Sequence, residues 1–218
     1  MITSLSLRRG LTKFAAALAA FGLAAAISAP ASAVIYTFAD LDGAGTGGSV
    51  AGQITVDVTD AGGGQVLFTF ANAGPLSSAV EQINFADVGN LLGSFASFAA
   101  STGVSFAVNL ANLPQGNTIG FVSTDGFQAT PPPGGPNGNS INPGESLGIK
   151  FNLNGTFAAV LAALDSGALR IGLHVISLPD GSSDTLVTDI PDVPVPAALP
   201  LLLTGLGGLA FMRRRKAA

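Results

Sequence analysis

Hydrophobic and polar residues alternate along much of the chain between residues 34 and 192. The alternation is clearest from Val50 to Val58 and again from Val66 to Phe70. A period of two places successive side chains on opposite faces of an extended strand, so that one face is buried and the other is solvated. On this basis we predict strands at residues 34–38, 50–58, 66–70, 82–86, 104–110, 119–123, 147–153, 169–176 and 185–188.

One segment departs from this pattern. Between Thr156 and Asp165, apolar residues recur at spacings of three and four, as on one face of a short helix. Clusters of Gly, Asn, Asp and Pro separate the short strands. The sequence therefore predicts an all-β ectodomain, an antiparallel β-sandwich of jelly-roll-like type with one short helix.

Two stretches are expected to be loops. Residues 42–49 are rich in glycine, and residues 129–144 contain five prolines and four glycines. Proline and glycine in such numbers are incompatible with a regular hydrogen-bonded ladder. We expect residues 129–144 to form a flexible surface loop.

The N-terminus carries the pattern of a secretory signal peptide. Arg8, Arg9 and Lys13 precede an apolar stretch from Phe14 to Ile27, and an A-x-A cleavage site follows. Its two alanines are Ala31 and Ala33, so signal peptidase would leave Val34 first. Residues 1–33 are therefore predicted to be a signal helix that the secretion machinery removes.

The C-terminus, residues 193–218, has three parts in a fixed order. A short motif comes first, an uncharged apolar run from Ala198 to Met212 follows, and a basic cluster comes last. The motif residues are Val193, Pro194, Val195, Pro196 and Ala197, and the basic residues are Arg213, Arg214, Arg215 and Lys216. Such a run predicts a transmembrane helix with its basic end in the cytoplasm.

This tail resembles the sorting signal of PEP-CTERM proteins of Gram-negative bacteria. Val195 stands where the usual motif has Glu, so the chain is most similar to the VPLPA-type variants. The resemblance implies recognition by an exosortase, which cleaves near the motif and passes the ectodomain to the cell surface or the exopolysaccharide matrix. The residues alone also fit a simple membrane anchor that is never processed.

Charge is distributed very unevenly between the ends and the middle of the chain. All 13 acidic residues lie from Asp40 to Asp192, whereas Lys150 and Arg170 are the only basic residues between the two signals. The ectodomain of residues 34–192 therefore has a net charge of −11, which argues against nucleic acid as a partner. The chain has no cysteine and one histidine, which disfavours thiolate or imidazole metal sites.

A serine hydrolase is a remote alternative. Residues 144–148 fit G-x-S-x-G, and Ser146, Asp165 and His174 follow in the order of a hydrolase triad. A nucleophile elbow needs a strand before the serine and a helix after it, but here a turn precedes Ser146 and a predicted strand follows. We expect His174 to be a surface or edge histidine.

A calcium-stabilised binding module is a stronger alternative. Aspartates gather in or beside predicted turns, and Ca²⁺ binds carboxylate and carbonyl oxygens that converge from loops. Asp and Gly also dominate turns for conformational reasons alone, so the pattern is not specific. The candidate ligands are Asp40, Asp42, Asp180 and Asp184, with Asp189 and Asp192 nearby.

Together these patterns predict an exported, non-enzymatic protein of the cell surface or exopolysaccharide matrix, with a structural or adhesive role. The chain has no tryptophan and one tyrosine, Tyr36, and most phenylalanines occupy alternating strand positions. Aromatic platforms for a glycan are therefore not expected, and contact with a polysaccharide would rest on polar loops or bridging cations.

Overall fold

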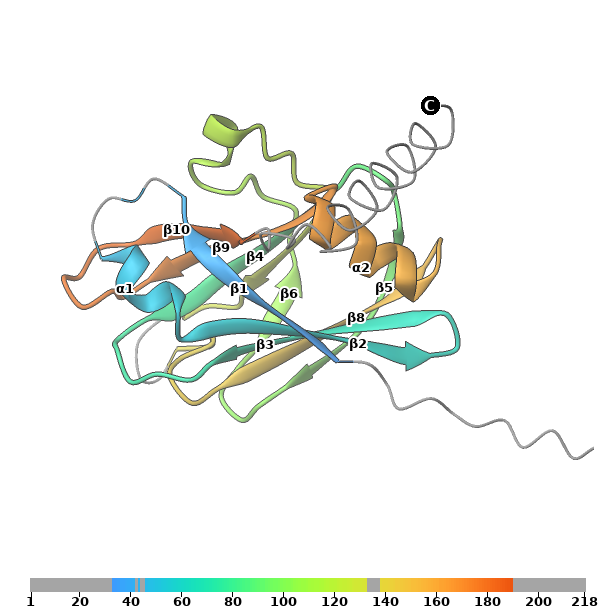
Figure 1. The fold of residues 1–218 in the computed structure, drawn as a ribbon. Coiled ribbons are helices and arrows are strands. Elements are labelled where there is room, and N and C mark those ends of the chain that lie inside the picture. Colours follow the sequence, from blue (N-terminus) through green and yellow to red (C-terminus); the bar gives the residue numbers. More distant parts are fainter. Residues whose placement is uncertain (1–32, 42, 44–45, 133–137, 190–218) are drawn as a thin grey trace, which may run out of the picture. The chain divides into compact units, whose positions relative to one another are not determined.

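A computed structural model describes residues 33–41, 43, 46–132 and 138–189 (Figure 1). The strands are β1 (Val34–Asp40), β2 (Ile54–Gly62), β3 (Gln65–Asn72), β4 (Ala79–Asp87), β5 (Leu92–Ala100), β6 (Phe106–Val108), β7 (Asp125–Ala129), β8 (Ser146–Leu153), β9 (Leu169–Ile176) and β10 (Asp184–Thr188). The helices are α1 (Gly47–Ala51), the short 3-10 helix η1 (Gly116–Ile119) and α2 (Phe157–Ser166). Both predicted targeting signals, including the cleavage-site residue Ala31 and the whole tail, lie outside the described residues.

All ten strands belong to one antiparallel sheet in the order β5-β8-β3-β2-β1-β10-β9-β4-β7-β6. Strand β1 joins two halves of this sheet. Its residues Val34–Thr37 pair with β2, and its residues Phe38–Asp40 pair with β10. We call β5, β8, β3 and β2 the first half, and β10, β9, β4, β7 and β6 the second half. The predicted all-β antiparallel class is confirmed.

The two halves pack against each other through phenylalanine rings. Phe85 of β4 lies edge-on to Phe68 of β3 and to Phe151 of β8, with ring centroids 5.0 and 5.2 Å apart. Phe127 of β7 contacts Phe151 at 5.7 Å and Phe95 of the edge strand β5 at 5.4 Å. Edge-to-face contacts of this kind add to the stabilisation from apolar burial. The alternating positions thus supply a common core between the halves.

Helix α2 follows β8 and packs by Val160, Ala163 and Leu164. The side chain of Thr156 caps its N-terminus by accepting a hydrogen bond from the backbone N–H of Ala159 at 3.2 Å. Gly167 ends the helix in the left-handed conformation (φ 72°) that glycine adopts without steric cost. The predicted helix is confirmed to within one residue at each end.

Two predictions at the strand ends and loops are wrong. Residues 119–123 form no strand, because they belong to the β6–β7 loop (residues 109–124), where the backbone N–H of Phe121 donates to Gly116 and the carbonyl oxygens of Ile119 and Gly120 accept from Arg170. The segment that leads into β2 is helical from Gly47 to Ala51, which places Val50 fully in the core. Within residues 129–144, the described part is also more ordered than expected, since Ile141 is fully buried and bridges to Val80.

Strands β5 and β7 were not predicted. Strand β5 contains alanine, serine and glycine between its apolar residues, and its pairing with β8 shifts register twice. These irregularities break the period of two.

Among the described residues, no helix combines the length and the apolar character needed to cross a bilayer.

Candidate functional site

A bulge in β4 creates the most distinctive polar arrangement in the described structure. In the pairing of β4 with β9, Val80 lies opposite Val175 and Gln82 lies opposite His174, so Glu81 is an extra residue between them. Glu81 Oε2 lies 3.4 Å from His174 Nδ1. A bulge lets one strand turn a side chain out of the regular alternation. Here it brings a carboxylate beside the only histidine of the chain.

Burial changes the pKa of His174 in this pair. The side chains of His174 and Glu81 are only 20% and 17% exposed. Burial lowers the pKa of His174 because it disfavours the charged imidazolium, while the nearby carboxylates of Glu81 and Asp184 oppose that effect. His174 therefore favours the neutral form more strongly than a free imidazole does.

The sequence-based expectation for His174 holds in one respect and is wrong in another. His174 lies on the outward face of β9, opposite the fully buried Leu173 and Val175, as the alternation predicted. It is not an edge residue, because β9 is an internal strand that lies between β10 and β4.

The β6–β7 loop covers the outer face of the second half next to this pair (Figure 1). Asn84 of β4 is fully buried and donates hydrogen bonds from Nδ2 to the carbonyl oxygen of Ala111 at 2.6 Å and to Ser123 Oγ at 2.8 Å. Gln82 Nε2 donates to Asn84 Oδ1 at 2.6 Å and to the carbonyl oxygen of Asn112 at 3.1 Å. The loop forms no β-ladder that would pair its carbonyl oxygens, so these side-chain amides donate hydrogen bonds to them instead.

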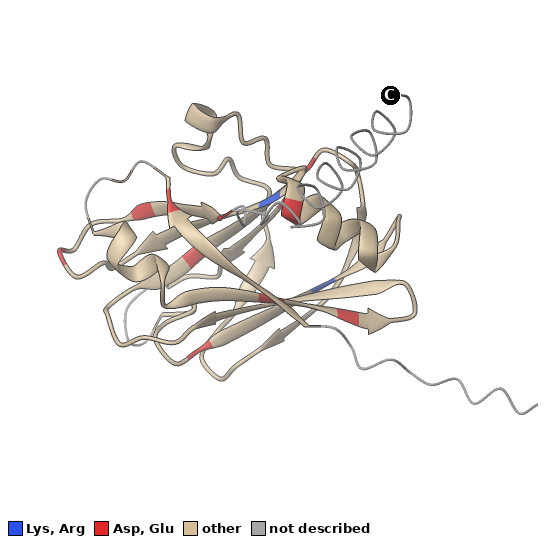
Figure 2. Ribbon diagram, viewed as in Figure 1, with Lys and Arg blue, Asp and Glu red and all other residues tan. Residues whose placement is uncertain are grey.

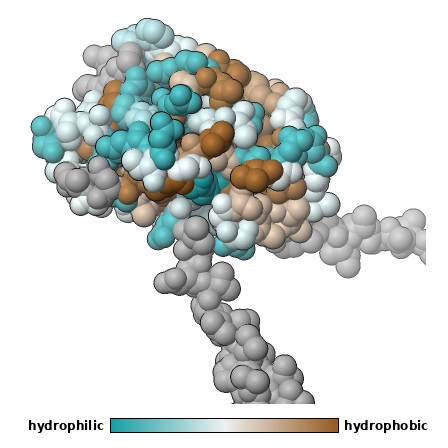
Figure 3. Space-filling view, turned by 90° about the horizontal axis from the view of Figure 1, so that it is seen from above, coloured by the Kyte–Doolittle hydropathy of each residue, from teal (hydrophilic) through white to brown (hydrophobic). Residues whose placement is uncertain are grey.

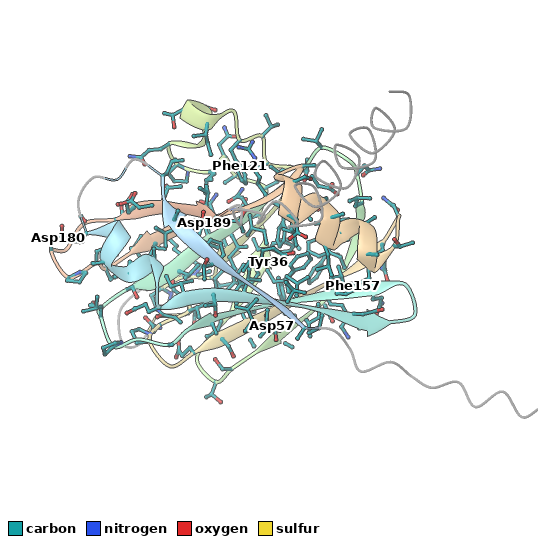
Figure 4. The ribbon with its side chains drawn as sticks, viewed as in Figure 1. Tyr36, Asp57, Phe121, Phe157, Asp180 and Asp189 are labelled. Carbon is teal, nitrogen blue, oxygen red and sulfur yellow. The ribbon has the colours of Figure 1, made fainter. Side chains whose placement is uncertain are left out.

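A small apolar contact and one cation fix the far end of the loop. Leu113 and Phe121 of the loop pack on Gly172 of β9, where a Cβ atom would clash with Leu113. Arg170 donates hydrogen bonds to the carbonyl oxygens of Ile119 at 3.1 Å and Gly120 at 2.8 Å, and its guanidinium lies 5.3 Å from the Phe121 ring centre. Figure 4 shows Phe121 beneath the outer turn of this loop.

A groove of about 310 Å³ opens beside Glu81. Its polar lining includes an amide pair, in which Asn109 Nδ2 donates to Gln128 Oε1 at 2.5 Å. The lining residues are Glu81, Ala107, Asn109, Gln128, Ala129, Thr130 and Pro131. A smaller hollow of about 80 Å³ lies next to His174, between Gln115 and Asp184. The Glu81–His174 pair thus lies between two depressions on one face.

The carboxylates of the candidate calcium ligands accept hydrogen bonds from nearby backbone N–H groups. Asp40 accepts hydrogen bonds from the backbone N–H groups of Gly43 at 3.2 Å and Gly48 at 3.0 Å. Asp180 accepts from the N–H and hydroxyl of Ser182, and these bonds lower its pKa. Asp184 accepts from the N–H of Thr185 at 2.7 Å. Within the ranges that the structure describes, no group of three or more His, Cys, Asp or Glu residues is arranged to hold a metal ion.

The remaining aspartates of that candidate set are not all near one another. Asp180 is in the turn between β9 and β10, whereas Asp189 follows the opposite end of β10, and Figure 4 shows the two well apart. Asp42 and Asp192 lie outside the described residues. A calcium site therefore stays a prediction.

The three residues of the hydrolase hypothesis have separate partners. Ser146 begins β8 in the first half and accepts a hydrogen bond on its carbonyl oxygen from Ser101 Oγ at 3.1 Å. Asp165 of α2 accepts a hydrogen bond from Tyr36 Oη at 2.9 Å, and burial together with this carboxylate raises the pKa of Tyr36. His174 pairs with Glu81 on the outer face of the second half. The core lies between Ser146 and His174, so the structure does not assemble them into a triad.

Sequence reasoning missed Glu81 and the groove residues. Glu81 lies in a stretch where the alternation slips by one residue, and this slip is the signal that would have indicated a bulge.

Comparison of the chain with family models, with curated proteins and with solved structures gave no match.

Proposed function

We propose that this chain is an exported protein that an exosortase sorts to the cell surface or the exopolysaccharide matrix, where its role is structural or adhesive and not enzymatic. The tail at residues 193–218 and the signal peptide at residues 1–33 support the export route. We further propose that the two facing halves of the sheet form a jelly-roll-like sandwich that serves as a stable extracellular module.

One structural observation favours a binding or structural role most directly. The chain's only histidine pairs with Glu81 on an outer face, while Ser146 lies on the other side of the aromatic core. A serine nucleophile needs a base within hydrogen-bond reach. The residues that the sequence offered for hydrolysis are therefore used for other contacts.

Charge supports the same proposal. Figure 2 shows acidic residues over several strands and turns and very few basic ones. A surface of this kind repels nucleic acid and anionic lipid. It is compatible with solubility in a hydrated, anionic extracellular matrix.

The test is the intact mass and location of the protein in cells with and without the host's exosortase. We expect an extracellular product that begins at Val34, ends near Pro196 and is formed only when the exosortase is present. Pro196→Ala should abolish processing, and the matched variant Pro191→Ala, outside the motif, should leave it intact. A product that retains Arg213 to Lys216 in the inner membrane of both strains would reduce the tail to an anchor and contradict the proposal.

A further inference from the structure

We propose that the groove beside Glu81 binds a sugar residue of a neutral polysaccharide. This inference rests on the proposed function for the source of the polymer, since a matrix protein meets polysaccharide in its surroundings. The site itself is argued from the groove's size, its lining and its charge.

The groove has the dimensions of a small-molecule site. Its volume of about 310 Å³ falls at the lower end of the range of ligand pockets. Ala107 and Pro131 supply exposed apolar lining, on which the C–H face of a sugar ring can pack. No aromatic ring lines it, so a flat apolar ligand would lack a stacking partner.

The polar groups of the groove are suited to hydroxyls. The hydrogen bond between Asn109 Nδ2 and Gln128 Oε1 leaves one amide acceptor, Asn109 Oδ1, and one amide donor, Gln128 Nε2, for a ligand. Glu81 adds a carboxylate acceptor, of which Oε2 lies 3.4 Å from His174 Nδ1. Neighbouring hydroxyls of a sugar both donate and accept, so they can use all three groups.

Charge excludes the other obvious classes of ligand. A phosphate or a uronic acid would meet the Glu81 carboxylate, and the lining contains no Lys or Arg to balance the repulsion. A calcium ion would find one carboxylate in the groove where it needs several oxygen ligands. A neutral, hydroxyl-rich ligand has neither difficulty.

The approach to the groove is also uncharged. Residues 88–124, which include β5, β6 and the whole β6–β7 loop, contain no Asp, Glu, Lys, Arg or His. Exposed apolar residues occur in the same segment, with Val108 60% and Leu110 59% exposed. Figure 3 views the molecule from the side of this loop and shows apolar and hydrophilic groups intermixed. A neutral polymer chain can therefore extend from the groove along β6 and this loop without meeting a charged side chain of that segment.

Affinity electrophoresis of the full-length chain tests the proposal. The gels contain neutral glucan, mannan or galactan, or polygalacturonate as the acidic polymer, and the detergent has a polyoxyethylene headgroup so that it carries no sugar. We expect at least one neutral polymer to retard the protein, and polygalacturonate to have no effect. Gln128→Ala should raise the dissociation constant about tenfold, because it removes the amide that donates to the ligand.

Gln65→Ala is the matched control. Gln65 of β3 forms the same kind of amide pair, with Asn152 at 2.8 Å, on the first half of the sheet and away from the groove. If Gln128→Ala does not fold, Ala107→Leu is the second variant, because it fills the groove without removing a hydrogen bond and should abolish retardation. The proposal is overturned if no neutral polymer retards the chain, if only polygalacturonate does, or if the groove variants behave like Gln65→Ala. None of these results would change the exosortase-dependent processing, so the two proposals fail separately.

Discussion

The outer faces of the two halves of the sheet differ in what covers them: solvent on the first half and the β6–β7 loop on the second half. On the first half, β2 and β3 alternate between buried and part-exposed residues, as expected of a sheet with one solvated face. On the second half, β4 is buried at nearly every position because the β6–β7 loop covers it. The comparison shows that a covered sheet face needs buried polar groups, since the covering backbone must be hydrogen bonded.

The same comparison explains where the unusual chemistry lies. Gln82 and Asn84 bind the covering loop, and Glu81 and His174 lie where that cover ends. The first half also has polar outer residues, such as the half-buried Gln65 and the exposed Asn152, but these bond to side chains of neighbouring strands and not to a covering loop. The groove thus occurs at the boundary between a covered and an uncovered surface.

Replacement of a buried amide should have the largest effect on stability. Asn84→Ala removes the hydrogen bonds that Asn84 makes with the Ala111 carbonyl, Ser123 Oγ and the Gln82 amide. Only the longer bonds from Gln82 Nε2 to the carbonyl oxygens of Asn112 at 3.1 Å and Ala111 at 3.4 Å remain. We expect the free energy of unfolding to fall by about 2–3 kcal/mol, because buried unsatisfied groups are costly. Urea unfolding monitored by circular dichroism measures this change. The same substitution on the first half, Asn152→Ala, should cost less than about 0.5 kcal/mol, and equal losses would contradict the contrast between the faces.

Loss of the cation that holds the loop should have a smaller effect. Arg170→Ala removes two hydrogen bonds to the β6–β7 loop and the contact with Phe121. We expect a loss of about 1 kcal/mol together with faster proteolysis inside residues 109–124. Lys150→Ala, which removes the other basic residue of the ectodomain, is the control. Unchanged cleavage of the loop in Arg170→Ala would show that Arg170 does not hold it.

The smallest effect is the dependence of stability on pH through His174. Its pKa in the folded state is below the ordinary value of 6.5, so the unfolded chain binds a proton first as the pH falls. Protonation of His174 therefore lowers the free energy of unfolding as the pH falls below about 6.5 and has no such effect above that pH. Glu81 and Asp184 face the imidazole, and Glu81→Gln should lower the pKa of His174 further by removing an attracting charge.

Proton NMR can follow this titration without assignment, because the chain contains one histidine. His174→Gln should remove the corresponding part of the change in unfolding free energy between pH 7 and pH 5. Gln65→Ala, on the first half, should leave the titration unchanged. A pKa of His174 above 6.5 in the folded protein would reverse the sign and refute the role assigned to burial.

Local periodicity in the sequence was enough to locate several strands and one helix. The alternation in β3, β8 and β9 located those strands and the inward phenylalanines, and the spacing in residues 156–165 located α2. Asn84 and Gln82 carry no comparable signal, because polar residues in a strand are equally typical of a solvated face. The slip in the alternation at Glu81 indicates a bulge but not the partner of the carboxylate. Likewise, nothing local distinguishes Ile119 to Ser123 from a short strand.

The covered outer face and the contact between Glu81 and His174 could be found only from the three-dimensional fold. Asn84 bonds to a carbonyl 27 residues away, and the Glu81–His174 contact depends on a register shift between β4 and β9. Such contacts join segments that are distant in sequence, and a one-residue slip exchanges the two faces of a strand. Sequence periodicity therefore defined the core, whereas long-range pairing created the groove.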